Sequence, residues 1–257
     1  MAFHRCYVVE MDALHNHIRP GMPKKYSLRS AKRPFVETIL SCANLCAAML
    51  PFVDRRTTND AIQGWQLLHH AQARRVVALS FMNIVSAWEE FVQSCFIRYM
   101  AGASSENCPR LRMGPCQSLK HAGQVLMRRS NFDFESDYIS WTPWNQVVDR
   151  AKIFFEGGLP FAAVNASTQK HVDDAFKLRN RVAHSSEKCR TDFVEVAKRH
   201  LGIPVGGNLT RGYDAGSLLL AQPKLFGATC GQDTYFMAYV DLFMELADLI
   251  VPAKSGS

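Results

Sequence analysis

Arg179, Asn180 and His184 are the residues of this sequence whose types and spacing best suit proton transfer at a phosphate. An arginine guanidinium binds phosphate oxygens, and a histidine imidazole takes up and releases protons near neutral pH. Asn180 and His184 are spaced i,i+4, so on a helix the amide can orient the imidazole. Together these groups supply the charge stabilisation and proton transfer that phosphodiester cleavage requires.

The three residues fall near the end of a predicted helix that starts at an N-cap Ser167 or Thr168 and runs to about His184. Arg179 shares the apolar stripe of this helix and is predicted to face a packed or interfacial surface. A guanidinium in such a place needs an anionic partner. At the helix C-terminus the macrodipole favours the charged form of His184.

A long helix over about 60–100 is the strongest structural signal, because the segment has no proline and a single glycine. One apolar stripe runs along it at helical spacing: Val77, Phe81, Ile84, Trp88, Phe91 and Cys95. Glu89 shares a side with apolar residues and is therefore predicted to be half-buried beside a cation. Three positions stay open for Glu89: the functional site, a structural ion pair, and a solvated rim.

The remaining pattern predicts an all-α protein, a helical bundle with decorated loops. Further helices are expected at about 34–50, 118–129, 144–155, 188–200 and 232–250. The glycine-rich segment 203–231 is expected to hold a short hairpin. We divide the chain into a basic N-terminal extension, 1–33, and a helical domain, 34–257.

Basic residues gather in two parts of the chain, which carries a net charge of +7. The first part is the N-terminal extension, and the second is 101–130, which holds Arg110, Arg112, Arg128 and Arg129. Such segregated charge favours a polyanionic partner, so these arginines, together with Arg181, are predicted to contact nucleic-acid phosphates. The alternative is that they serve only solubility.

Several function classes lack their usual signatures. Neither His15 and His17 nor His69 and His70 has the cysteine or carboxylate partners of a zinc pattern, so we predict no metal and no cofactor. No Walker loop, dinucleotide fingerprint or nucleophile elbow occurs. No signal peptide or membrane-spanning run is found, and the cysteines are not paired in CxxC motifs. We therefore expect a reducing, cytoplasmic location without membrane contact.

The segment Arg179-Asn180-Arg181-Val182-Ala183-His184 resembles the R-x4–6-H motif of HEPN domains, with the polar residue that often follows the arginine. The long helix before it looks like the first core helix of the RiboL-PSP-type branch of that superfamily. The resemblance covers about 60–250. It implies a helical domain that forms homodimers and, in active members, a metal-independent ribonuclease, often of toxin–antitoxin or phage-defence systems.

By this resemblance the chain is expected to be an endoribonuclease that cleaves RNA by attack of the ribose 2′-hydroxyl. Arg179 would hold the phosphate, His184 would transfer protons, Asn180 would orient His184, and Glu89 would lie at the site. Expected partners are RNA, a second copy of the chain, and an antitoxin or regulatory protein. The alternatives are a catalytically silent HEPN module that binds a nucleotide or a partner protein, and a plain structural bundle.

Overall fold

A computed structural model describes residues 26–50, 68–105, 109–133, 137, 139–224, 226 and 233–252. Within these ranges the chain is all-α, as predicted, and one isolated bridge, between Leu111 and Phe155, is the only β-type pairing that joins two described residues. No helix in the same ranges has both the length and the apolar character that a bilayer crossing demands.

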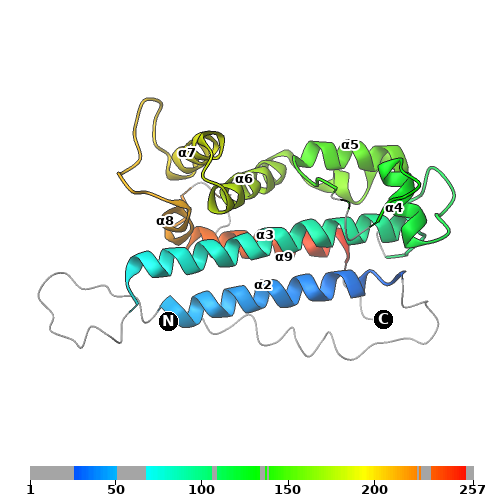
Figure 1. The fold of residues 1–257 in the computed structure, drawn as a ribbon, viewed down its shortest axis with the longest axis horizontal. Coiled ribbons are helices and arrows are strands. Elements are labelled where there is room, and N and C mark those ends of the chain that lie inside the picture. The colour runs from blue at the N-terminus through cyan, green and yellow to red at the C-terminus, as the bar shows by residue number, and fades with distance from the viewer. Residues whose placement is uncertain are drawn as a thin grey trace, which may run out of the picture.

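Three long helices form the base of the molecule: α2 (Arg29–Met49), α3 (His70–Met100) and α9 (Tyr235–Ile250). They run along the long axis, with α2 antiparallel to the other two (Figure 1). Trp88 of α3 lies at their centre. Its ring packs on Phe35 of α2 at 5.6 Å and on Phe243 of α9 at 5.2 Å between ring centroids.

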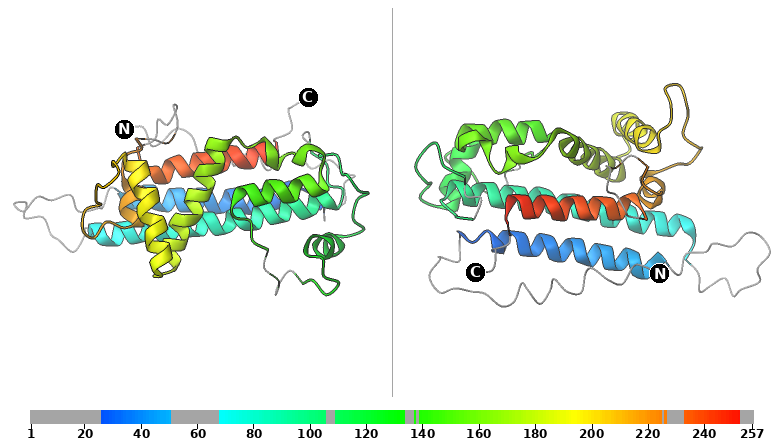
Figure 2. Two further views of the ribbon diagram at one scale, coloured as in Figure 1. Left: turned by 90° about the horizontal axis from the view of Figure 1, so that it is seen from above. Right: turned by 180° about the vertical axis from the view of Figure 1, so that it is seen from behind.

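A second layer covers this base, made of α5 (Trp144–Phe154), α6 (Ala166–Ala183) and α7 (Glu187–Leu201). Two 3-10 turns, Glu156–Gly158 and Phe161–Ala163, connect α5 to α6. The pair α6 and α7 crosses the long helices steeply at one end of the molecule, beside the short α8 (Ala215–Leu220) (Figure 2). At the opposite end lies α4 (Leu119–Met127).

The predicted apolar stripe of α3 is confirmed, since every one of its six residues is at most 1% exposed. The predicted helices of the described part also exist, and most have small shifts at their ends. The largest difference is at the helix expected from about residue 60: α3 begins at His70, because His69 caps it by accepting from the Ala71 N–H, and residues 51–67 lie outside the described part. One shift is informative: α2 begins at Arg29 and not at residue 34, so it includes part of the segment assigned to the N-terminal extension. The buried side chains of Leu28 and Ala31 explain this earlier start, because they join the core.

Two local predictions are wrong. The N-cap of α6 is Asn165, whose side chain accepts a hydrogen bond from the Thr168 N–H at 2.9 Å, and not Ser167 or Thr168. The described part of 203–231 holds the helix α8 and no strand. Asp214 caps that helix by accepting from the Ser217 N–H, and Leu218 and Leu219 are buried beneath it.

Candidate functional site

Arg179 lies on the side of α6 that faces α3, where it pairs with Glu89. The distance from Arg179 Nη2 to Glu89 Oε2 is 3.5 Å, and Glu89 is only 7% exposed. The sequence therefore correctly gave Arg179 an anionic partner and Glu89 a cationic one, and the two predicted site residues meet. This pair ties the end of α6 to the middle of the long helix.

Asn180 is oriented by Arg179 and not by His184. Its Oδ1 accepts from Arg179 Nη1 at 3.1 Å. The contact between Asn180 and His184 is a backbone one, in which the His184 N–H donates to the Asn180 carbonyl at 2.8 Å. The expected side-chain hydrogen bond from Asn180 to His184 is not formed, because His184 leaves the helix with an extended backbone (φ −134°, ψ 144°) and so loses the i,i+4 geometry of a helix.

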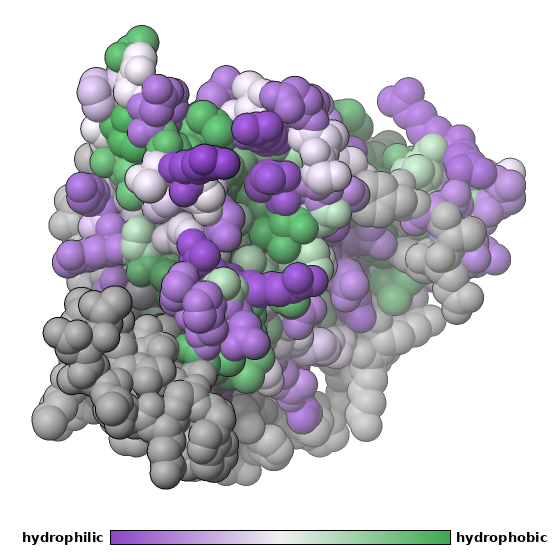
Figure 3. Space-filling model, turned by 60° about the vertical axis from the view of Figure 1, so that its left-hand side comes forward, coloured by the Kyte–Doolittle hydropathy of each residue, from purple (hydrophilic) through white to green (hydrophobic). Residues whose placement is uncertain are grey.

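His184 is the C-cap of α6 and is exposed in a groove of about 560 Å³. The first turns of α3, the end of α6 and the start of α8 form its walls. Three arginines line it with His184: Arg74 and Arg75 from α3, and Arg181 from α6. In Figure 3, which brings this end of the molecule forward, hydrophilic side chains surround small hydrophobic patches.

Contacts within the groove hold two of its arginines. Arg74 donates to Ser217 Oγ at 3.1 Å, and its Nε lies 3.9 Å from Asp214 Oδ2. Arg181 donates to the His184 carbonyl at 3.3 Å. Asp214 is the one acidic residue of the lining, so the groove has an excess of positive charge that suits an anionic ligand.

The close approach of α8 to α3 shapes one wall of this groove. A Cβ built on Gly216 would lie 2.2 Å from the Arg74 carbonyl oxygen, which no side chain tolerates. Glycine at this position therefore lets the two helices touch backbone to backbone. The contact sets where Arg74 stands relative to His184.

The other predicted phosphate-binding arginines lie at the far end of the molecule. Arg110, Arg112, Arg128 and Arg129 are all exposed, and Arg129 pairs with Asp137 at 2.8 Å. They follow the last turn of α3, whereas the groove lies beside its first turns (Figure 1). With 31 residues in α3, its two ends are about 45 Å apart. The structure thus separates the two groups of basic residues.

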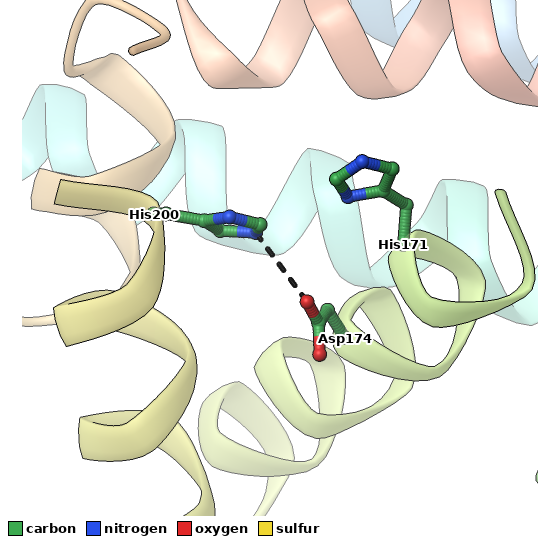
Figure 4. Close-up of side chains that lie close together, drawn as sticks. All are labelled: His171, Asp174 and His200. Carbon is green, nitrogen blue, oxygen red and sulfur yellow. Dashed lines mark ion pairs between the residues drawn. The ribbon is translucent and has the colours of Figure 1, made fainter. Parts of the chain in front are cut away.

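A second constellation, which sequence reasoning missed, lies nearer the N-terminus of α6. His171 and Asp174 of α6 and His200 of α7 bring one ligand atom each within 4.8 Å of the others (Figure 4). Asp174 and His200 are 2% and 1% exposed. The i,i+3 spacing of His171 and Asp174 was a usable signal for this cluster, but nothing local in the sequence points to His200.

No protein-family model, curated protein or solved structure matches the chain. The likeness to HEPN domains therefore rests on the motif and on the order of the helices, and it stays a prediction.

Proposed function

We propose that the chain is a metal-independent endoribonuclease of the HEPN type, and that the groove around His184 binds the RNA backbone at the scissile phosphate. The observation that carries the proposal is the exposed imidazole of His184 in one groove with Arg74, Arg75 and Arg181. A titratable base among guanidinium groups is suited to proton transfer beside a charged phosphate.

In this mechanism the ribose 2′-hydroxyl attacks the adjacent phosphorus and the bond to the 5′-oxygen breaks. His184 takes the proton of the hydroxyl or gives one to the leaving oxygen. The guanidinium groups of the groove counter the charge that develops on the phosphate oxygens. The products would be a 2′,3′-cyclic phosphate and a 5′-hydroxyl, and no metal ion is needed for either proton transfer.

A homodimer belongs to this proposal. Arg179 and His184 are five residues apart, which on an ideal helix separates their directions by about 140°. Within one protomer Arg179 faces Glu89 while His184 faces the groove. A second copy across a two-fold axis would bring another motif to the same RNA. Sedimentation of a stable, fully active monomer at micromolar concentration would contradict this part.

The decisive experiment incubates the purified full chain with RNA in EDTA and compares it with His184→Ala. The matched control is His121→Ala, which alters a partly buried histidine in the first turn of α4, at the other end of the molecule. We expect cleavage by the wild type and by His121→Ala, but not by His184→Ala. A 2′-deoxy sugar at the cut site should block cleavage, because it removes the nucleophile. Cleavage that needs a divalent ion would contradict the mechanism.

A catalytically silent module that binds a nucleotide or a partner protein is the second candidate. It is favoured by one observation: Arg179 is neutralised by Glu89, and Asn180 contacts Arg179 and not the His184 side chain. RNA or nucleotide binding in the groove, without any cleavage by the dimer, would support this candidate over the enzyme.

The cellular role that we propose is that of a cytoplasmic toxin or defence effector held in check by an antitoxin or regulatory protein. This proposed cellular role is based only on the resemblance to HEPN domains. Induced expression of the wild type should arrest growth, and His184→Ala should not.

A further inference from the structure

The cluster of His171, Asp174 and His200 joins two helices. His171 and Asp174 lie one turn apart on α6, and His200 is in the last turn of α7. Figure 4 shows the three side chains converging on one space from the two helices. Asp174 Oδ2 lies 3.8 Å from His200 Nε2, which is too far for a hydrogen bond.

Two atoms that face this space are buried without a hydrogen-bond partner among the described residues. They are His171 Nδ1 and Asp174 Oδ2. A buried polar atom without a partner is costly, so a ligand that contacts both atoms would remove two such costs at once. When the proton of the His171 ring is on Nε2, Nδ1 carries a lone pair, as does the carboxylate oxygen Oδ2. One cation can therefore bind both atoms.

Neighbouring groups prepare these residues as ligands. Arg199 donates to Asp174 Oδ1, which holds the carboxylate and leaves Oδ2 directed at the histidines. Such a contact behind a ligand fixes its orientation. Burial lowers the pKa of His171, and burial, with His171 next in importance, lowers the pKa of His200 to about 3. Both imidazoles are therefore neutral near pH 7 and keep a lone pair for a metal.

An aromatic wall closes the other side of the cluster. The Phe226 ring stacks on His171 at 4.4 Å, and the Tyr235 ring stacks on His200 at 5.0 Å between ring centroids. The Tyr239 hydroxyl is hydrogen-bonded to His200 Nε2 at 3.0 Å, so coordination of an ion at this nitrogen would replace that hydrogen bond. This enclosure limits the access of bulk water and strengthens the attraction between an ion and the carboxylate.

We propose that His171, Asp174 and His200 form a binding site for one divalent transition-metal ion of the zinc class, which links α6 to α7. Two imidazoles and a carboxylate suit such an ion, whereas Mg²⁺ and Ca²⁺ prefer oxygen ligands alone. At bonds of about 2.0–2.2 Å, tetrahedral donor atoms are about 3.3 Å apart, so modest side-chain rotations close the present arrangement.

This site is separate from the proposed ribonuclease groove. Asp174 and Arg199 line a different cavity of about 370 Å³, which does not include His184. The ion is therefore expected to hold α7 on α6 and to take no part in RNA cleavage. Arg199 and Lys170 contribute positive charge that opposes the ion, so we expect weaker binding than at a site with thiolate ligands.

The test uses the metal-stripped full chain, titrated with Zn²⁺ by calorimetry and by thermal melting. We expect one equivalent to bind, and the melting temperature to rise by about 5 °C or more at a hundredfold excess over Kd. Mg²⁺ should have no such effect. His171→Ala should lose this binding and this shift, whereas the control His15→Ala/His17→Ala, which removes another pair of histidines, should keep both.

Two further measurements keep the proposal open to refutation if a variant folds poorly. Asp174→Asn retains a hydrogen-bond acceptor for Arg199 and should fold, as judged by circular dichroism, yet bind Zn²⁺ at least tenfold more weakly. Co²⁺ bound to the wild type should give visible ligand-field absorption, and adding Zn²⁺ should displace the Co²⁺ and abolish this absorption. No stoichiometric Zn²⁺ binding by the wild type, or unchanged binding by a folded His171→Ala, would overturn the site. Since RNA cleavage is expected to persist in EDTA, failure of one proposal leaves the other intact.

Discussion

Two parts of α6 each carry a histidine and a charged residue and use them differently. At its C-terminal end, His184 and Arg181 face an open groove with the arginines of α3. Nearer its N-terminus, His171 and Asp174 face α7, where Asp174 and His200 are almost fully buried. An exposed imidazole exchanges protons with solvent and substrate, whereas a buried neutral one is better suited to hold a ligand. Burial, more than residue type, separates proposed catalysis from proposed metal binding.

The largest expected effect concerns the groove. Removing His184 as His184→Ala should reduce RNA cleavage at least about a hundredfold, because a proton-transfer group contributes that much or more. The melting temperature should hardly change, because His184 is exposed and its side chain forms no hydrogen bond with another described residue. Single-turnover cleavage and a thermal melt measure the two effects. A large loss of stability would instead make His184 a structural residue.

A second prediction breaks the wall of the groove and leaves its charged residues in place. Gly216→Ala puts a methyl group against the Arg74 carbonyl, so α8 must move away from α3. We expect a loss of about 2 kcal/mol in the free energy of unfolding, together with weaker RNA binding. The control is Gly114→Ala, where a Cβ meets no atom within 4 Å. Equal stability of the two variants in chemical denaturation would contradict the close approach.

A third prediction decides whether Arg179 acts on RNA or only holds α6 in place. Arg179→Ala deprives Glu89 of this guanidinium and should cost about 1–2 kcal/mol of stability, reduced by the partial exposure of the arginine. In a double-mutant cycle with Glu89→Gln, a coupling of about 1 kcal/mol is expected. A stable but inactive double variant, with the single variant Glu89→Gln still active, would show that Arg179 also acts on RNA. Full activity of that variant would restrict Arg179 to positioning α6.

The smallest effects concern the two separated groups of arginines. Neutralising Arg74 and Arg75 should weaken the binding of a short oligonucleotide several-fold. The slope of log K against log salt concentration should fall by about one for each arginine, since each contributes one phosphate contact. Neutralising Arg110 and Arg128 should matter only for longer RNA. Arg110 follows the end of α3 and Arg128 is the C-cap of α4, which lies at the opposite end of the molecule from the groove. Fluorescence anisotropy at several salt concentrations checks both expectations. Equal effects on a short oligonucleotide would contradict the separation.

Helix periodicity made much of the fold predictable. The apolar stripe of α3, the cationic partner of Glu89 and the position of His184 at the end of α6 all follow from local spacing, although Glu89 is buried and not half-buried as predicted. The two wrong predictions also concern local structure. Asn165 competes with Ser167 and Thr168 as the N-cap of α6. The glycine-rich segment predicts a hairpin, but Asp214 caps a short helix that includes the following leucines.

The sequence by itself determined which residues share a side of each helix, because a helix turns its side chains by a fixed angle at each residue. Only the tertiary structure decided which sides meet. Arg74 and Arg75 stand with His184 because α8 and α6 pack at the start of α3. His200 reaches His171 and Asp174 because α7 folds back on α6. The crossing and register of two helices depend on how their side chains interlock, which is a property of both surfaces and is not encoded in the spacing of either one.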